Sequence, residues 1–343
     1  MTHRGLNRRH VLQGLGAAAG LATTGTFLSV GPSAAADFKI RMQLGWLASN
    51  GILGEVMADK LGYFAEEGLE LDIIPGGPNI DGVASVASGA NNFGSISSSP
   101  SLMLARSAGL PIKCIAAGYQ QHPFTYFSME ANPVRKPEDL VGKKVATQGT
   151  ARILLRALLA KNGIDESQVE VSVMGGDMAP LKVGQVDVAT GWQTNVGALS
   201  VLGDERVDMK LWDAGIQLYA NPYYTTDDVL QENSDKITAA IRAISRGWGA
   251  VYENPEAGVD ALVERYPNLD KDSEMKAVDL VLGFSFNDKT KAGGWGIMTA
   301  DNWQEQIDTY NSLEQFTNGA PNVADIMTLD ILEATKDVRP TFG

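Results

Sequence analysis

The segment KIRMQLGWLASNGILGEVMADKLG, residues 39–62, decides the fold class. Residues 39–44 favour a strand, the chain breaks at Gly45-Trp46, and a helix with one apolar side follows until Gly62 ends it. A strand, a glycine-containing loop and an amphipathic helix form the repeating unit of an α/β protein with mainly parallel sheets.

The same unit recurs along the chain and predicts two lobes. Further strands are expected at 69–74, 93–96 and, in a second series, at 144–147, 169–173 and 186–189. The stretch ASGANNFG at 87–94 is echoed by KVGQVDVA at 182–189, each with a helix end, a glycine, a polar turn and a strand. From Thr226 onward the pattern turns helical, which indicates a helical support in the C-terminal third.

These patterns predict the limits of the two lobes. We expect residues 37–125 and 222–343 to form lobe I, which is discontinuous, and residues 126–221 to form lobe II. Residues 221–224 would then be the crossover by which the chain returns to lobe I.

Residues 1–36 are typical of a removable export signal. A cluster of three arginines within residues 4–9 precedes a weakly apolar run at 11–30, and three alanines at 34–36 suit a signal peptidase. The pair Arg8-Arg9 resembles the twin-arginine signal. We therefore expect the chain to act in the periplasm. The alternative is a membrane anchor, because about 20 apolar residues span a bilayer.

Composition excludes several classes of function. Without residues 1–36, which hold three arginines and no acidic residue, 25 basic residues face 41 acidic ones, a net charge of -16. Such a charge argues against nucleic acid or an anionic membrane surface as a partner. Cys114 is the single cysteine and His122 the only histidine after residue 36. A disulfide and a histidine-rich or thiolate zinc site are thereby excluded, and we expect no metal and no cofactor.

Five segments are expected to meet at a ligand site. In an open parallel sheet, small molecules bind beyond the carboxyl ends of the strands, where loops and helix starts converge. The candidate ligand-binding residues in such positions are Trp46, Asn50, Ser97, Ser98, Ser99, Tyr119, Gln120, Thr150, Arg152, Trp192 and Asn195.

The residue types indicate how such a site would bind. Two tryptophans, Trp46 and Trp192, could clamp a planar molecule between the lobes. The serines at 97–99 begin a helix, where hydroxyls and free N–H groups accept a polar or anionic group, although serine is also an ordinary helix cap. Thr150 and Arg152 would neutralise an acidic group, and the alternative for Arg152 is a surface ion pair. For His122 we expect a polar residue at a lobe edge or pocket rim.

Four motifs carry a family resemblance. GYFAEEGL at 62–69, residues 83–89, ARSAGLP at 105–111 and PEDLVGKK at 137–144 resemble the solute-binding proteins of ABC importers for nitrate, sulfonates, taurine and thiamine pyrimidines. The resemblance covers most of the chain after residue 36. It implies a two-lobed, type II periplasmic-binding fold, a ligand trapped by hinge closure, and delivery to an ABC permease and ATPase. We expect such a receptor to be a monomer.

The sequence is compatible with more than one class of ligand. In the pyrimidine-binding branch that the first loop resembles, a Trp is followed by Asn, His and Gly; here Trp46 and Gly54 fit, Asn50 lies one place late, and Ile52 replaces the His. A flat N-heterocyclic or aromatic compound is our interpretation. The alternatives are an organic sulfonate or nitrate-type anion, a thiamine-pyrimidine-synthase-like enzyme, and a receptor that docks a sensor.

Overall fold

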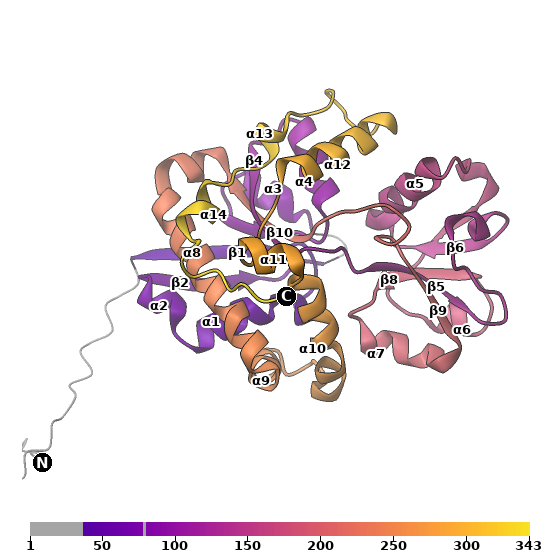
Figure 1. Ribbon diagram of the computed structural model, residues 1–343, viewed down its shortest axis with the longest axis horizontal. Coiled ribbons are helices and arrows are strands. Elements are labelled where there is room, and N and C mark those ends of the chain that lie inside the picture. The colour runs from indigo at the N-terminus through magenta and orange to yellow at the C-terminus, as the bar shows by residue number, and fades with distance from the viewer. Residues whose placement is uncertain (1–36, 78–79) are drawn as a thin grey trace, which may run out of the picture. The chain divides into compact units, whose positions relative to one another are not determined.

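Two five-stranded sheets, each flanked by helices, form the framework of the computed structural model, which describes residues 37–77 and 80–343. The predicted export signal, residues 1–36, lies outside the described residues. The two-lobed α/β fold expected from the sequence is confirmed (Figure 1).

The first sheet has the strand order β2-β1-β3-β10-β4. Its strands β1 and β2 match the residues predicted as strands almost end to end, and β1 pairs in parallel with both β2 and β3. The strands are β1 (Phe38–Leu44), β2 (Leu69–Ile74), β3 (Phe93–Ser95), β4 (Ile112–Tyr119) and β10 (Ala220–Thr226).

The second sheet has the order β7-β6-β8-β5-β9, and β6 pairs in parallel with β7 and β8. Its last predicted strand begins and ends later than expected, as β8. The strands are β5 (Phe124–Met129), β6 (Lys144–Thr147), β7 (Glu170–Val173), β8 (Val188–Trp192) and β9 (Arg206–Lys210).

Both sheets are mixed but mainly parallel, because in each of them four of the five strands run in the same direction. In the first, β10 runs antiparallel to β3 and β4, and in the second β5 runs antiparallel to β8 and β9. The segment around Asn221 was expected to be a crossover and is instead part of the inner strand β10. The chain passes from β9 to β10 before this segment, and Pro222, which has no N–H to donate, hid the strand from sequence reasoning.

Helices on both sides of the first sheet complete the first lobe, which we define as that sheet with its helices. Figure 1 shows α3, α4, α12 and α13 on one side and α1, α2 and α8 to α10 on the other. The bounds are α1 (Leu53–Lys60), α2 (Tyr63–Glu66), α3 (Gly82–Ala87), α4 (Ser99–Ser107), α8 (Asp227–Glu253), α9 (Pro255–Arg265), α10 (Lys271–Ser285), α11 (Asp288–Gly293), α12 (Ala300–Ser312), α13 (Val323–Ile326) and α14 (Asp330–Ala334). The helical C-terminal support expected from the sequence is therefore present.

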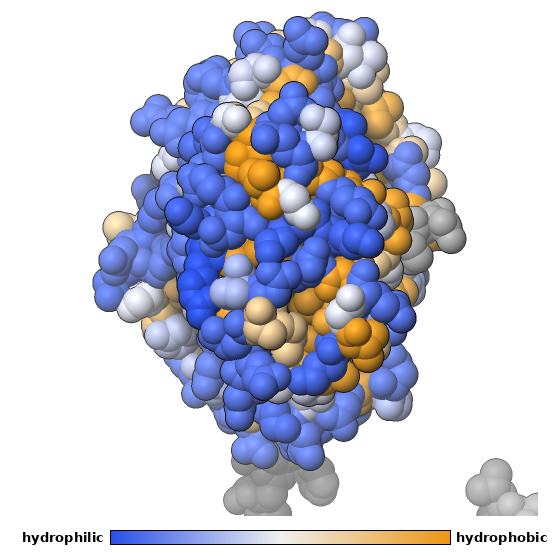
Figure 2. Space-filling model, turned by 90° about the vertical axis from the view of Figure 1, so that its right-hand side faces the viewer, coloured by the Kyte–Doolittle hydropathy of each residue, from blue (hydrophilic) through white to orange (hydrophobic). Residues whose placement is uncertain are grey.

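The second lobe consists of the second sheet and its shorter helices. These are α5 (Arg152–Lys161), α6 (Ala179–Lys182) and α7 (Val196–Leu199), with 3-10 helices such as η3 (Gly149–Ala151) between them. The face of this lobe in Figure 2 is mainly hydrophilic with scattered apolar patches. Over the described part of the chain, no helix has the length and apolarity needed to cross a membrane. The residue limits of the lobes stay a prediction.

Close helix packing holds the first lobe together behind the site. Helix α1 lies so near α8 that a Cβ on Gly247 would come within 2.0 Å of the carbonyl oxygen of Gly54, and a Cβ on Gly54 within 2.2 Å of the Trp248 ring. Only glycine permits this approach. This close contact with α8 fixes the position of α1, the helix that follows the loop after β1.

Candidate functional site

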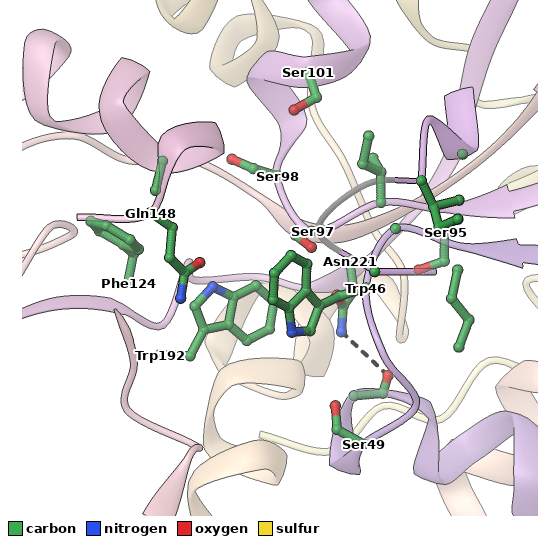
Figure 3. A pocket seen from close by; sticks show the side chains of 18 of the residues that line it. Trp46, Ser49, Ser95, Ser97, Ser98, Ser101, Phe124, Gln148, Trp192 and Asn221 are labelled. Carbon is green, nitrogen blue, oxygen red and sulfur yellow. Dashed lines mark hydrogen bonds between the residues drawn. The ribbon is translucent and has the colours of Figure 1, made fainter. Parts of the chain in front are cut away.

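A cavity of about 240 Å³ lies where loops of both lobes meet (Figure 3). The first lobe contributes the loop after β1, residues near the start of α3, and the β3–α4 turn. The second lobe contributes residues before and within α5 and the end of β8. Five of the predicted residues line it: Trp46, Ser97, Ser98, Trp192 and Asn195.

Trp46 projects from the loop that follows β1, and its side chain is 37% exposed. The loop is held by two glycines: a Cβ on Gly45 would lie 2.9 Å from the Ile96 Cα, and one on Gly76 would lie 2.7 Å from the Trp46 nitrogen. Because the neighbouring backbones come this close, the loop has little room to move. An exposed indole on a tightly held loop is a ready surface for stacking.

Trp192 enters the same cavity from the end of β8 and is supported from behind. Its ring lies 5.9 Å from that of Tyr119, tilted, and 5.5 Å from that of His122, edge to face. Both supporting rings are fully buried. The structure thus presents one indole from each lobe to one cavity (Figure 3).

The three serines at 97–99, at the start of α4, do not all have the same role. Ser97 and Ser98 line the cavity, and the Ser98 hydroxyl is buried with no hydrogen-bond partner among the described residues. Ser99 instead donates to Gln306 Oε1 at 2.5 Å inside the protein. Its N–H donates to the Tyr219 carbonyl, and Pro100 has no N–H. This helix start therefore has fewer free donors for an anion than the sequence indicated.

Three more predicted residues are buried outside the cavity lining. Asn50 is buried and donates to the Thr194 carbonyl at 3.2 Å and to Glu274 Oε2 at 2.8 Å. Gln120 is buried and donates to the Ala117 and Ile297 carbonyls. Tyr119 supports Trp192, and burial raises the pKa of its phenol.

Arg152 is held on the surface of the second lobe. Its guanidinium bonds Glu166 at 2.5 Å, and Arg156 shares the same carboxylate. The side-chain hydrogen bond from Arg152 lowers the pKa of Glu166. Thr150 belongs to η3, and its side chain lies outside the described residues. The surface ion pair is thus the arrangement that Arg152 adopts.

Several lining residues were missed by sequence reasoning. Phe124, Gln148 and Asn221 line the cavity, as does His122, which the sequence placed only at a rim. Phe124 begins β5 and pairs with Trp192 in the second sheet, and β10 of the first sheet carries Asn221 with a φ of 47°. An antiparallel strand brings its first residues to the edge where its neighbours end. The unrecognised strands explain why these residues were missed.

The cavity is polar but carries little charge. Its only ionisable lining residues, among those described, are Asp81 and His122, and neither arginine nor lysine lines it. Asp81 caps α3 by accepting from the Ala84 N–H at 2.9 Å. Burial lowers the pKa of His122 to about 3, so its ring is neutral at physiological pH. Over residues 37–77 and 80–343, no group of three or more potential metal ligands occurs.

Several known proteins are similar to this chain in sequence. The chain is 28% identical over 274 residues to the formylaminopyrimidine-binding protein of Halalkalibacterium halodurans, covering 76% of this chain and 81% of that one. It is 26% identical to the riboflavin-binding protein RibY of Chloroflexus aurantiacus, covering 72% and 73%. A 4-amino-5-hydroxymethyl-2-methylpyrimidine phosphate synthase of Legionella pneumophila is 21% identical, covering 67% and 75%.

Solved structures share the fold at lower identity. The periplasmic aliphatic sulphonate binding protein SsuA from Escherichia coli superposes with a TM-score of 0.64 at 16% identity, covering 84% of this chain and 91% of that one. The alkanesulfonate-binding protein SsuA from Xanthomonas axonopodis pv. citri, bound to MOPS, gives 0.62 at 16% identity, with 85% and 98% covered. The NMT1/THI5-like family model matches residues 49–258, more than half of the 343 residues, and the chain therefore belongs to the NMT1/THI5-like family.

Proposed function

We propose that this chain is the solute-binding component of an ABC importer and captures a flat, uncharged N-heterocyclic compound between its lobes. The observation that carries the proposal is a cavity that receives one indole from each lobe and, among the described residues, no cationic side chain.

Stacking supplies the main binding surface. Trp46 comes from the first lobe and Trp192 from the second, so a planar ring that contacts both is held only when the lobes are together. Base–aromatic stacking is worth about 1–3 kcal/mol per ring. Two indoles therefore give a binding energy that depends on lobe closure, as a transport receptor requires.

Hydroxyl and amide side chains of the cavity would form hydrogen bonds with the ligand. Ser97, Ser98, Gln148, Asn195 and Asn221 line the cavity and can each donate and accept hydrogen bonds. Such groups suit the ring nitrogens, amino groups and carbonyls of a heterocycle. The volume of about 240 Å³ lies below the roughly 300–1,000 Å³ usual for drug-sized ligands, which favours a small ring system.

The charge of the cavity argues against a sulfonate or nitrate-type anion. Arg152, the cation that the sequence offered for an acidic group, is paired with Glu166 outside the lining, and His122 is neutral. The carboxylate of Asp81 lies in the lining and would repel an anion. Because an unpaired anion in a partly buried site is costly, we drop the acidic substituent that the sequence allowed.

The curated relatives support the same class of ligand. The two with the highest identity cited above are named for binding a formylaminopyrimidine and riboflavin, both flat N-heterocycles. A synthase is a more distant relative, so an enzyme is the alternative. Cys114, the single cysteine, is buried in the first sheet and offers no exposed thiol for catalysis.

Export and partners complete the proposal. We infer that residues 1–36 direct the chain to the periplasm, where it serves as a monomer and delivers its ligand to an ABC permease and ATPase. Translocation that persists after Arg8→Lys and Arg9→Lys together would contradict the twin-arginine route.

A thermal-shift comparison tests the proposed ligand class, because a ligand that binds only the folded state raises the unfolding temperature. The probes are riboflavin and a formylaminopyrimidine against taurine and MOPS. We expect at least one heterocycle to stabilise the protein and neither sulfonate to do so. Trp192→Ala should abolish the shift, whereas Trp212→Ala, a matched change outside the cavity, should keep it. Turnover of a pyrimidine precursor, or bound pyridoxal phosphate in the purified protein, would instead support the enzyme.

A further inference from the structure

His122 lies in the segment that crosses from β4 of the first sheet to β5 of the second. It lines the cavity, and its side chain is 1% exposed. Its ring meets Trp192 edge to face at 5.5 Å and Phe124 edge to face at 6.2 Å. The imidazole is therefore held in the aromatic wall on which the proposed ligand would stack.

One ring nitrogen is used by the protein itself. His122 Nδ1 accepts a hydrogen bond from the Phe124 N–H at 3.2 Å. A neutral imidazole has one accepting and one donating nitrogen, so this bond places the proton on Nε2. Burial lowers the pKa of the ring to about 3, which keeps it in this neutral form.

The other nitrogen has no hydrogen-bond partner. His122 Nε2 is buried and unpaired among the described residues. A buried donor without an acceptor costs about 1–3 kcal/mol, and most such groups in folded proteins are paired. An unpaired donor in the wall of a ligand cavity is explained if the ligand supplies its acceptor.

We propose that His122 recognises the ligand through a hydrogen bond, in which its Nε2–H donates to an acceptor atom of the bound heterocycle. The heterocycle must therefore present a carbonyl oxygen or an unprotonated ring nitrogen to the wall formed by Trp192 and Phe124. The proposal rests on the proposed function and narrows its substrate class. Because Nε2 is buried in this structure, the ligand contacts it when the Trp192 indole shifts to stack on the ligand. An amino group or C–H edge at this position would leave the donor unpaired.

Histidine-selective NMR of the full chain tests the proposal directly. Proteins labelled with nitrogen-15 in histidine give separate signals for His3, His10 and His122, and the signal absent from His122→Phe identifies the last. The ligand-free protein should show the Nε2–H tautomer. Saturation with riboflavin or a formylaminopyrimidine, whichever stabilises the protein, should shift the Nε2 signal and slow exchange of its proton.

Binding measurements provide the second arm. His122→Phe keeps the aromatic edge and removes the donor, so affinity for the same probe should fall about 5- to 100-fold, the equivalent of roughly 1–3 kcal/mol. His122→Gln restores an amide donor and should recover part of the loss. The unfolding temperatures of the ligand-free variants show whether each remains folded.

The outcomes separate the two proposals. If a heterocycle binds, yet the Nε2 signal does not move and His122→Phe binds as tightly as the wild type, His122 has only a packing role and the inference is wrong, while the proposed function stands. If His122→Phe does not fold, the signal absent from His122→Gln identifies His122, and a shift of its Nε2 signal supports the inference. If no heterocycle binds the wild type, the proposed function and this inference both fall.

Discussion

Glu55 is a buried carboxyl whose ionisation should set much of the pH dependence of stability. It lies in α1 with 0% exposure; Oε1 accepts from the Tyr223 hydroxyl at 2.8 Å, and Oε2 is unpaired among the described residues. Burial raises the pKa of this carboxyl from 4.5 to about 7, and the hydrogen bond from Tyr223 only partly opposes that shift. The folded protein therefore keeps the proton that the unfolded chain has released.

The sign and size of the effect follow from this difference. Below pH 4.5 both states are protonated and Glu55 costs nothing. As pH rises from 4.5 to about 7, the free energy of unfolding falls by about 1.4 kcal/mol per pH unit, or about 3 kcal/mol in total, and then levels off. Glu55→Gln is uncharged at every pH. It should match the wild type near pH 4.5 and be about 3 kcal/mol more stable at pH 8.

Urea unfolding of both proteins at several pH values between 4.5 and 8 measures this difference. Glu232→Gln, an exposed substitution on α8, is the matched control, and its free energy of unfolding should change with pH as that of the wild type does. If the stability gap between Glu55→Gln and the wild type is the same at every pH, the carboxyl ionises in its ordinary range and the reasoning is refuted.

Further substitutions test the packing and the site. Trp46→Ala should weaken heterocycle binding about 5- to 100-fold in calorimetry, through loss of stacking worth about 1–3 kcal/mol. Arg152→Ala should leave affinity unchanged, because its partner is Glu166; a loss greater than threefold would contradict this. Asn50→Ala removes the donor to both Thr194 and Glu274 and should shift the ligand-free protein toward open lobes, seen as a larger radius of gyration in solution scattering. Gly247→Ala should destabilise by about 3 kcal/mol in urea, whereas Gly249→Ala on the same helix, whose Cβ would meet only Pro340 at 3.4 Å, should not.

Alternating burial accompanies a parallel strand that the sequence predicted accurately. In β2, Leu69–Ile74, buried and more exposed residues alternate, and the predicted strand has the same limits. The antiparallel strand β5 carries no such signal, because its first five residues are all buried and the period of two disappears. Burial does alternate along β9, but this strand has only five residues and three of them are charged.

The site was predictable where it depends on strand ends. Trp46 and Trp192 follow or end parallel strands, and both line the cavity, as expected from the general position of ligand sites in such sheets. Phe124 and Asn221 reach the same edge from antiparallel strands, which the sequence did not reveal. Asn50 carries the polar amide expected of a ligand-binding residue, yet its partners lie far along the chain at Thr194 and Glu274. Only the tertiary structure brings these together.

Calorimetric titration of the wild-type protein with riboflavin, a formylaminopyrimidine, taurine and MOPS tests the central claim most directly. The proposed function predicts micromolar or tighter binding of at least one heterocycle, lost in Trp192→Ala, and no measurable heat of binding with either sulfonate. Tight binding of taurine or MOPS, with no binding of the heterocycles, would show that the cavity accepts an anion despite its lack of cationic lining residues, and would contradict the claim.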